Sequence, residues 1–186
     1  MLQLRGHSLP AVELYRLALV LRPLCRHYQA LLIVNDRIDV GLAAGADGFQ
    51  LGIRSLPLAV VRQLAGKDYL LGASVHTPEE ALTAWTSGAD FLLAGTIFAS
   101  HTHPDEPPGG IDLLPAIIAK LSTSPKVGVC PLVAIGGITS ANARQVMEAR
   151  ADGIAVISAI LDAANTKEAV RELRTAINSK ESRETL

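Results

Sequence analysis

The chain has 186 residues, of which 49% are apolar, 19% are charged and only 4% are aromatic. This length suits one domain with a sizeable core, and aliphatic side chains must fill that core. The formal net charge is −1 without a basic block, so we expect neither nucleic acid nor an anionic membrane as a partner. No apolar run approaches the ~20 residues that span a bilayer, and the first residues do not resemble a signal peptide. We therefore expect a cytoplasmic protein.

Short apolar runs alternate with helical patterns along the chain. Strands are predicted at 2–5, 30–34, 49–51, 69–73, 91–94, 131–135 and 153–157. Helices are predicted at 8–27, 38–44, 57–66, from 77, at 111–121, at 140–149 and from about 163. Gly-Ala-Asp occurs at 45–47 and 88–90, with the variant Ala-Asp-Gly at 151–153, each time between a helix and a strand. Strict alternation of this kind predicts a parallel sheet with right-handed crossovers.

The last two predicted strands end at small residues. Gly136 and Gly137 follow the first of them, and Ser158 follows the second. Glycines let the backbone approach a ligand closely, and Thr139 or Ser140 is expected to cap a helix whose positive end favours an anion. The ends of neighbouring strands would then form a phosphate cradle; the alternative is two buried strands followed by ordinary tight turns.

Seven strand–helix units are present, whereas a closed (β/α)8 barrel needs eight. Because (β/α)8 barrels often bind phosphate after strands seven and eight, we expect an α/β fold of the TIM-barrel type over residues 1–179. Its first strand–helix unit is then missing, and residues 180–186 form a charged tail. An open doubly wound sheet is the alternative.

Barrel enzymes carry their chemistry at the C-terminal ends of the strands. Arg5 lies at such an end and can hold a carboxylate or phosphate with two hydrogen bonds. Histidine suits proton transfer near neutral pH, and several histidines fall on the same rim, although those of the long loop can equally be solvated. Asp36 has two plainer roles open to it, capping a helix or pairing with Arg37. The candidates at this rim are Arg5, His7, Asn35, Asp36, Gln50, Ser74, His76, Thr96, His101 and His103.

The sequence has no HExxH motif and no Cys/His cluster of metal spacing, so we expect no metal and no cofactor. A site made of histidines alone stays open. Cys25 and Cys130 stand apart without CxxC spacing, and we expect both to be reduced.

Several stretches together resemble the thiamin phosphate synthase/TenI superfamily over essentially the whole chain. The matching stretches are 3–5, 34–39, 45–52, 72–81, 88–91, 95–98, 133–139 and 156–160. The resemblance implies a (β/α)8 barrel that binds a thiazole phosphate, with the phosphate at Gly136, Gly137, Ile157 and Ser158.

Departures from the synthases decide between two branches of this superfamily. The synthases have a Lys two residues after the Arg, where this chain has His7, and a Thr-x-Thr-Lys loop, where it has residues 100–103 with His101 and His103. Their Gly-Gln-x-Asp run supplies an aspartate that, with the counterpart of Asp36, holds magnesium. Here that run ends in Ser55. Fewer groups remain to neutralise a pyrophosphate, so transferase activity is disfavoured.

The other branch resembles TenI-type thiazole tautomerases, which aromatise a carboxythiazole phosphate by removing and returning a proton. One histidine can do both without a cofactor. The residue that follows the glycine in the tautomerase motif is Thr96 here rather than histidine. We therefore predict His103, and after it His101, as the acid and base, with Arg5 holding the substrate carboxylate. The other predicted substrate contacts are His7, Asn35, Ser74, His76 and Thr96.

Two alternatives remain beside the tautomerase. One is a magnesium-dependent thiamin phosphate synthase, and the other is a non-catalytic binding or regulatory protein for a thiazole phosphate. Members of the superfamily normally begin with one more strand. Because the exposed edges of an incomplete barrel invite pairing, and by resemblance, we expect a homodimer.

Overall fold

The computed structural model describes residues 1–99 and 107–178, and strands alternate with helices through both ranges. The strands are β1 (Leu2–Leu4), β2 (Leu32–Asn35), β3 (Gly48–Leu51), β4 (Leu70–Val75), β5 (Phe91–Ala94), β6 (Leu132–Ile135) and β7 (Gly153–Ala155). The helices are α1 (Ala11–His27), α2 (Ile38–Ala44), α3 (Leu58–Ala65), α4 (Pro78–Thr86), α5 (Leu113–Leu121), α6 (Ala143–Glu148), α7 (Ser158–Leu161) and α8 (Thr166–Asn178). No helix within these ranges is long and apolar enough to cross a membrane.

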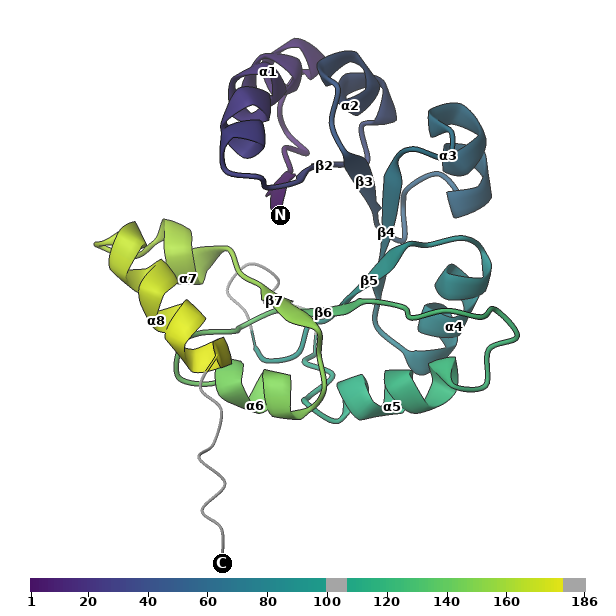
Figure 1. Ribbon diagram of the computed structural model, residues 1–186, viewed down its shortest axis with the longest axis vertical. Helices are drawn as coiled ribbons and strands as arrows, with labels where there is room; N and C mark the ends of the chain where they lie inside the picture. Colours follow the sequence, from purple (N-terminus) through teal and green to yellow (C-terminus); the bar gives the residue numbers. More distant parts are fainter. Residues whose placement is uncertain (100–106, 179–186) are drawn as a thin grey trace, which may run out of the picture.

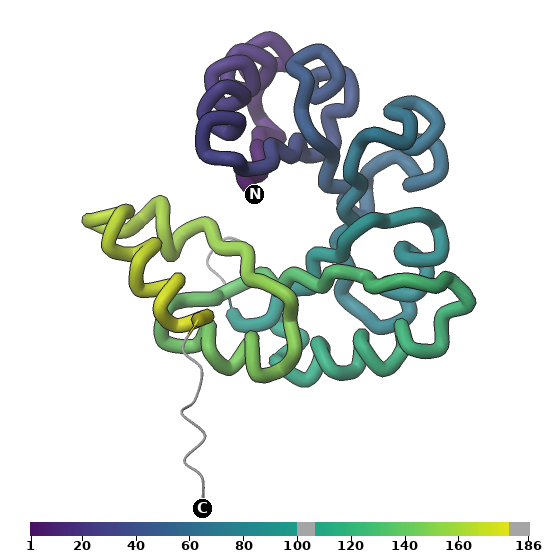
Figure 2. Tube along the Cα trace, in the orientation of Figure 1, coloured from purple at the N-terminus to yellow at the C-terminus, as the bar shows by residue number. Residues whose placement is uncertain are grey.

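The described strands form one parallel sheet in the order β1-β2-β3-β4-β5-β6-β7. Figure 1 shows the strands lining the inside of a curved wall, with the helices outside it. The wall is open between β1 and β7, and Figure 2 shows the first and last parts of the chain on the two sides of this opening. The predicted barrel with seven of eight units is confirmed. A doubly wound sheet is excluded because its strand order would reverse along the sheet.

Alternate residues of each strand face the helices. Leu32 and Val34 of β2 pack in one core cluster with Phe49 and Leu51 of β3. Because side chains alternate across a strand, their neighbours face the inside of the curved wall. These inner residues include polar side chains, which hydrogen-bond from strand to strand: Gln3 to Asn35, and Gln50 to Ser74. The inner face therefore carries polar groups, while the packed core lies between the sheet and the helices.

The repeated aspartates lock neighbouring strands together at their N-terminal ends. Asp47 donates its backbone N–H to the carbonyl of Leu32 at 2.8 Å, and its carboxylate accepts the Leu32 N–H at 2.7 Å. Asp90 makes the same pair of bonds to Leu71, and Asp152 makes it to Leu132. The repeated motif thus starts three strand pairings, at the rim opposite the candidate site.

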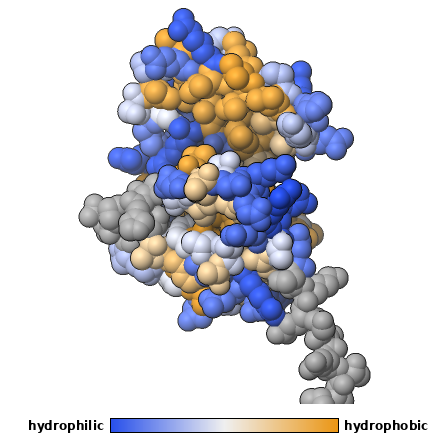
Figure 3. Space-filling model, turned by 90° about the vertical axis from the view of Figure 1, so that its left-hand side faces the viewer, coloured by the Kyte–Doolittle hydropathy of each residue, from blue (hydrophilic) through white to orange (hydrophobic). Residues whose placement is uncertain are grey.

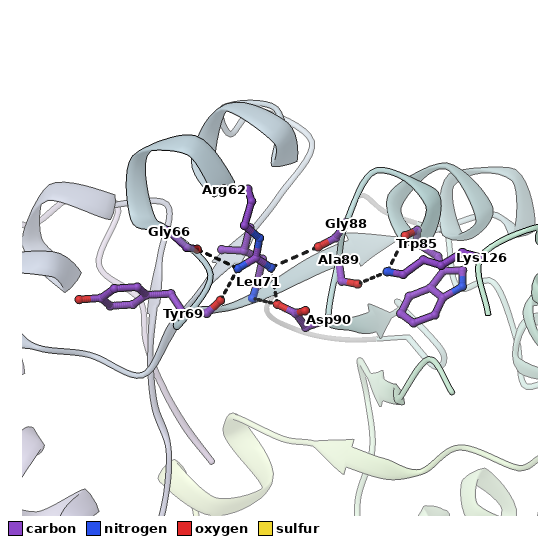
Figure 4. Close-up of polar contacts among 9 residues, drawn as sticks. All are labelled: Arg62, Gly66, Tyr69, Leu71, Trp85, Gly88, Ala89, Asp90 and Lys126. Carbon is purple, nitrogen blue, oxygen red and sulfur yellow. Dashed lines mark hydrogen bonds and ion pairs between the residues drawn. The ribbon is translucent and has the colours of Figure 1, made fainter. Parts of the chain in front are cut away.

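Arginine and lysine side chains reinforce this rim, as Figure 4 shows. Arg62 donates to the carbonyl of Tyr69 at 2.6 Å and to the Asp90 carboxylate at 2.6 Å. Lys126 donates to the carbonyls of Trp85 and Ala89 at 3.0 and 3.1 Å, and its ammonium lies 3.3 Å from the centre of the Trp85 ring. These contacts tie helix ends and loops to the starts of β4 and β5.

Three local expectations near the C-terminus are wrong. Neither Thr139 nor Ser140 caps a helix: α6 begins at Ala143, and the Asn142 side chain accepts the Thr139 N–H and donates to the Gly137 carbonyl. The chain after β7 forms the short helix α7 rather than a longer strand. The last helix begins at Thr166 instead of about residue 163.

Candidate functional site

Arg5 and His7 lie side by side just after β1. Arg5 Nε donates to Nε2 of His7 at 2.8 Å. Because this nitrogen accepts, the proton of a neutral His7 ring belongs on Nδ1, which lies 3.9 Å from Oδ2 of Asp36. Both side chains are exposed, so the pair presents a guanidinium and an oriented imidazole at the C-terminal rim of the sheet.

Asp36 connects the ends of β1, β2 and β3. It follows β2 with a φ of +57°, a conformation that aspartate tolerates better than most residues. Its Oδ2 accepts from Nδ2 of Asn35 at 2.8 Å, and its Oδ1 accepts from the hydroxyl of Ser55. The Ser55 oxygen in turn accepts the Gly52 N–H at 2.6 Å. These bonds fix the carboxylate from two sides.

The plainer roles considered for Asp36 are wrong. The Arg37 guanidinium instead binds Asp39 with two hydrogen bonds, at 2.9 and 2.5 Å. This contact holds the pKa of Asp39 below its usual range and raises that of Arg37. Helix α2 has no side-chain cap, so Asp36 does not cap it either. The carboxylate therefore belongs to the rim.

The Asp36 carboxylate does not match the magnesium site that the resemblance implies. Magnesium prefers oxygen ligands, normally one or two carboxylates together with substrate phosphates. Both oxygens of Asp36 already accept hydrogen bonds, and Ser55 stands at the position of the second aspartate as a donor. Within residues 1–99 and 107–178, no three or more His, Cys, Asp or Glu side chains are grouped to hold a metal ion. The described residues thus do not supply a two-carboxylate site.

Ser74 and His76 continue the rim along β4. Ser74 Oγ accepts from Nε2 of the buried Gln50 at 3.0 Å. His76 donates its backbone N–H to the Glu80 carboxylate at 2.7 Å, and its ring Nδ1 lies 3.2 Å from the same oxygen. Glu80 also donates its own N–H to Thr77, the N-cap of α4, so His76 is held at the start of this helix.

Thr96 packs against the glycine turn after β6. Phe98 donates its N–H to the Gly136 carbonyl at 3.0 Å, so the segment after β5 runs beside this turn. Gly136 and Gly137 have φ values of +102° and +61°. A Cβ on Gly136 would lie 2.4 Å from Cγ2 of Thr96. Only glycine therefore fits at Gly136 without a shift of the neighbouring segment.

The four predicted phosphate-binding residues lie at the ends of two paired strands. Gly136 and Gly137 follow β6, and the exposed residues Ile157 and Ser158 follow β7, its neighbour in the sheet. Ser158 is the first residue of α7.

The predicted site residues thus fall into two groups on one rim. The first runs along β1–β4 and comprises Arg5, His7, Asn35, Ser74 and His76, while the second, along β5–β7, comprises Thr96, Gly136, Gly137, Ile157 and Ser158. His101 and His103 lie outside the described residues. Sequence reasoning missed Glu80 as the partner of His76, and it took Ser55 merely as a lost ligand. The i,i+4 spacing of His76 and Glu80 in the sequence is a signal that could have predicted their contact.

Known proteins resemble this chain over most of its length. The TMP-TENI family, described as thiamine monophosphate synthase, matches residues 1–160. A thiamine-phosphate synthase of Pyrococcus furiosus is 42% identical over 176 residues, which are 95% of this chain and 81% of the relative. One of Chloroflexus aurantiacus is 48% identical over 162 residues, 87% of this chain and 71% of the relative.

A solved structure shares the fold of this chain. The thiamine phosphate pyrophosphorylase of Pyrococcus furiosus superposes with a TM-score of 0.84 at 41% identity, covering 94% of this chain and 81% of that one. These relatives are named as synthases, so the expectation that the chain stands closer to the tautomerases receives no support from them. With a family match over residues 1–160 and a relative 42% identical over 95% of its length, the chain belongs to the TMP-TENI family.

Proposed function

We propose that this chain is a thiamin-biosynthetic transferase of the thiamine-phosphate synthase type, which joins a pyrimidine pyrophosphate to a thiazole phosphate and releases pyrophosphate. The observation that carries this proposal is the 42% identity to a named synthase over 95% of the chain. It replaces the tautomerase as the leading hypothesis, because the departures at individual positions weigh less than this similarity along the whole chain.

The thiazole phosphate is proposed to bind at the ends of β6 and β7, on Gly136, Gly137, Ile157 and Ser158. Support comes from the positive φ values of the two glycines and from the pairing of the two strands. Backbone N–H groups at turns of this kind are good anion ligands. The phosphate then anchors one end of the substrate, and the thiazole ring lies over the inner face of the sheet.

The rim along β1–β4 is proposed to hold the second anionic group, the pyrophosphate of the pyrimidine substrate. Arg5 offers a guanidinium that can form two parallel hydrogen bonds to a phosphate or carboxylate oxygen pair. His7 accepts from Arg5 Nε and so orients the guanidinium, and Asp36 stands behind His7 at 3.9 Å. Asn35, Ser74, His76 and Thr96 complete the proposed substrate contacts. In the transferase, this end stabilises the departing pyrophosphate by charge and hydrogen bonds. We derive no step through a metal ion, because the described residues do not fit the two-carboxylate site.

The tautomerase remains a second candidate, favoured by Ser55 and His7. Ser55 removes one negative charge from the place where the resemblance expects a metal ligand, and His7 stands where it expects a lysine. In that reaction an imidazole takes the proton from the carbon that bears the carboxylate and returns it at the exocyclic carbon. No atoms are gained or lost. His103 and then His101 are the proposed acid and base, and Arg5 holds the substrate carboxylate.

One pair of assays separates these functions. The purified protein is given the pyrimidine pyrophosphate and the thiazole phosphate, with and without magnesium, and thiamin phosphate is quantified by chromatography. In parallel it is given the carboxythiazole phosphate without metal, and aromatisation is followed. Coupling supports the transferase, and absence of coupling beside rapid aromatisation replaces it with the tautomerase. Thiazole phosphate binding without either reaction identifies a non-catalytic binding protein.

The catalytic histidines have a test of their own. His103→Asn and His101→Asn are each expected to lower aromatisation if the tautomerase is correct, by about 10²–10⁴-fold for the residue that moves the proton. His27→Asn, at the end of α1 and away from the rim, is the matched control. Undiminished aromatisation in both His103→Asn and His101→Asn would reject the assignment of these two residues.

A further inference from the structure

Gln50 is a polar side chain in an almost fully buried place, with an exposure of 1%. Its neighbours on β3, Phe49 and Leu51, pack on the helix side, so Gln50 points to the inner face of the sheet. In Figure 3, which views the molecule from its open side, hydrophilic residues in blue lie at the height of the strands, but Gln50 lies beneath the surface. Buried polar groups are normally hydrogen-bonded, because an unpaired one costs free energy.

The amide of Gln50 bonds to β4 as a donor. Its Nε2 donates to Oγ of Ser74 at 3.0 Å, whereas its Oε1 has no hydrogen-bond partner within residues 1–99 and 107–178. A contact that served only stability could give way to a pair of apolar side chains at little cost. The half-satisfied amide therefore points to a role for the bond to Ser74 beyond holding two strands together.

Gly72 decides which end of the amide faces Ser74. A Cβ on Gly72 would lie 2.3 Å from Oε1 of Gln50 and 2.2 Å from Cζ of Phe91, so the carbonyl oxygen and the ring both lie directly over this glycine. A carbonyl oxygen accepts weak C–H contacts, whereas an NH2 group in its place would set a donor against the C–H. The amide is thus held with its carbonyl over Gly72 and its NH2 toward Ser74.

The direction of this bond determines what the Ser74 hydroxyl can do. Because an NH2 group only donates, Ser74 accepts from Gln50, and the hydroxyl proton is left for another acceptor. Ser74 is half-buried near the end of β4, and its side chain has no second hydrogen-bond partner in the described ranges. An ionised pyrophosphate offers only acceptors, so a hydroxyl that contacts it must donate.

We propose that Gln50 is a positioning residue that orients the Ser74 hydroxyl to donate to an anionic oxygen of the substrate pyrophosphate. Gln50 acts from beneath the site and does not touch the substrate. The inference rests on the proposed function for the contact between Ser74 and the pyrophosphate, and it adds the residue that gives this contact its direction.

Binding of inorganic pyrophosphate tests the proposal. Its dissociation constant for the full chain is measured by isothermal titration calorimetry, and the wild-type protein is expected to bind it. Ser74→Ala should raise this constant about tenfold, as for a lost hydrogen bond to a charged group. Gln50→Met, of similar size but without a donor, should raise it at least about threefold, because the hydroxyl is no longer held in one orientation. Gln63→Met, at an exposed position of α3, is the control that should bind normally.

Gln50→Glu makes the orientation itself measurable. A protonated carboxyl can donate to Ser74 as the amide does, whereas a carboxylate only accepts and turns the hydroxyl inward. Burial favours the protonated form, so affinity should be near that of the wild-type protein at about pH 5 and at least about tenfold weaker at about pH 8. Each value is divided by the wild-type value at the same pH, which removes the titration of pyrophosphate, His7 and His76. Gln63→Glu adds the same charge at the surface and should follow the wild-type protein.

The return of affinity on acidification of one Gln50→Glu sample also shows that this variant is folded. A double-mutant cycle separates orientation from charge repulsion. In Ser74→Ala, Gln50→Glu should weaken binding at about pH 8 by no more than about threefold, because no hydroxyl is left to turn.

Three results overturn the proposal: a wild-type protein that does not bind pyrophosphate, unchanged affinity in Gln50→Met, or an equal effect of Gln50→Glu with and without Ser74. Coupling of the two substrates is assayed separately. A protein that binds pyrophosphate in this Gln50-dependent way but does not couple them keeps the inference and loses the proposed reaction. A protein that couples them while Gln50→Met binds pyrophosphate normally loses the inference alone.

Discussion

The hydroxyl of Ser55 donates a hydrogen bond to Oδ1 of Asp36, and the amide of Asn35 donates to Oδ2 of the same carboxylate. A neutral donor thus stands where the resemblance to the synthases expects a second acidic ligand. The exchange removes one negative charge and satisfies Asp36 within the protein. This contact bears directly on the choice between the two proposed functions. The transferase handles a pyrophosphate, for which the resemblance expects a second acidic metal ligand, whereas the tautomerase does not.

Restoring the missing carboxylate should create a response to magnesium. In Ser55→Asp, two carboxylates face each other, and we expect the free energy of unfolding to fall by about 1–3 kcal/mol without metal. Magnesium should recover this loss, because a cation that binds the folded state stabilises it. Thermal unfolding with and without magnesium chloride measures both effects. Ser55→Ala, which loses the hydrogen bond but gains no charge, is the control. Identical melting curves of Ser55→Asp in both buffers would contradict the prediction.

The proposed phosphate site can be tested by adding a negative charge. Ser158 is the exposed first residue of α7, and Ser158→Asp places a carboxylate beside the proposed phosphate. Like charges disfavour each other, and we expect the dissociation constant of thiazole phosphate to rise by at least about tenfold. Isothermal titration calorimetry measures it. Ser122→Asp, at the C-cap of α5, is a control that should bind normally. Equal affinity of Ser158→Asp and the wild-type protein would place the phosphate elsewhere.

The periodicity of the sequence was enough to predict the strand order and most of the helices, because each unit buries its apolar residues locally against its neighbours. The repeated Gly-Ala-Asp motif marks the passage from a helix to a strand in the sequence. The reciprocal bonds of the repeated aspartates to Leu32, Leu71 and Leu132 join residues 15–20 positions apart, which a local pattern does not reveal. Helix α7, with four residues, is too short to show a helical period.

The candidate site was predictable in outline, because parallel strands bring their C-terminal ends to one rim. Its side-chain partners were not. Arg37 binds Asp39, while the Asp36 carboxylate binds Asn35 and Ser55, and sequence spacing alone does not distinguish these partners. The expected cap at Thr139 or Ser140 is wrong because α6 begins only at Ala143, and the Asn142 side chain bonds back to the turn at Thr139 and Gly137.

The first glycine of the turn after β6 should be irreplaceable. Gly136→Ala forces a left-handed backbone on alanine and places its Cβ 2.4 Å from Cγ2 of Thr96 and 2.8 Å from the Thr96 Cα. We expect a loss of about 2–4 kcal/mol in the free energy of unfolding. Gly153→Ala is a matched control in β7, because its Cβ would meet nothing within 4 Å. Urea denaturation compares the two. Similar midpoints for both variants would show that the turn accepts a side chain.

The opposite rim should matter for stability and not for binding. Arg62→Met keeps the apolar stem but removes the donors to Tyr69, Gly88 and Asp90, and we expect a loss of about 1–3 kcal/mol in the free energy of unfolding. Arg174→Met, at an exposed position of α8, should change stability by less than about 0.5 kcal/mol. Chemical denaturation and thiazole phosphate titration test this prediction. A weaker ligand affinity in folded Arg62→Met would contradict the separation of the two rims.

Cys130 should resist alkylation at neutral pH. Burial raises the pKa of its thiol to about 11, with Asp152 adding to the shift and Lys126 opposing it. Since the thiolate is the reactive form, Cys130 carries roughly a hundredfold less of it at pH 8 than an ordinary cysteine. Its rate with iodoacetamide should rise about tenfold per pH unit from 8 to 10, because thiolate accumulates in proportion to hydroxide below the pKa. Val127→Cys, at a 95% exposed position, should instead level off above about pH 9. Peptide mass spectrometry follows both sites in one sample, and a Cys130 rate that levels off together with that of Val127→Cys would mean that the thiol is solvated.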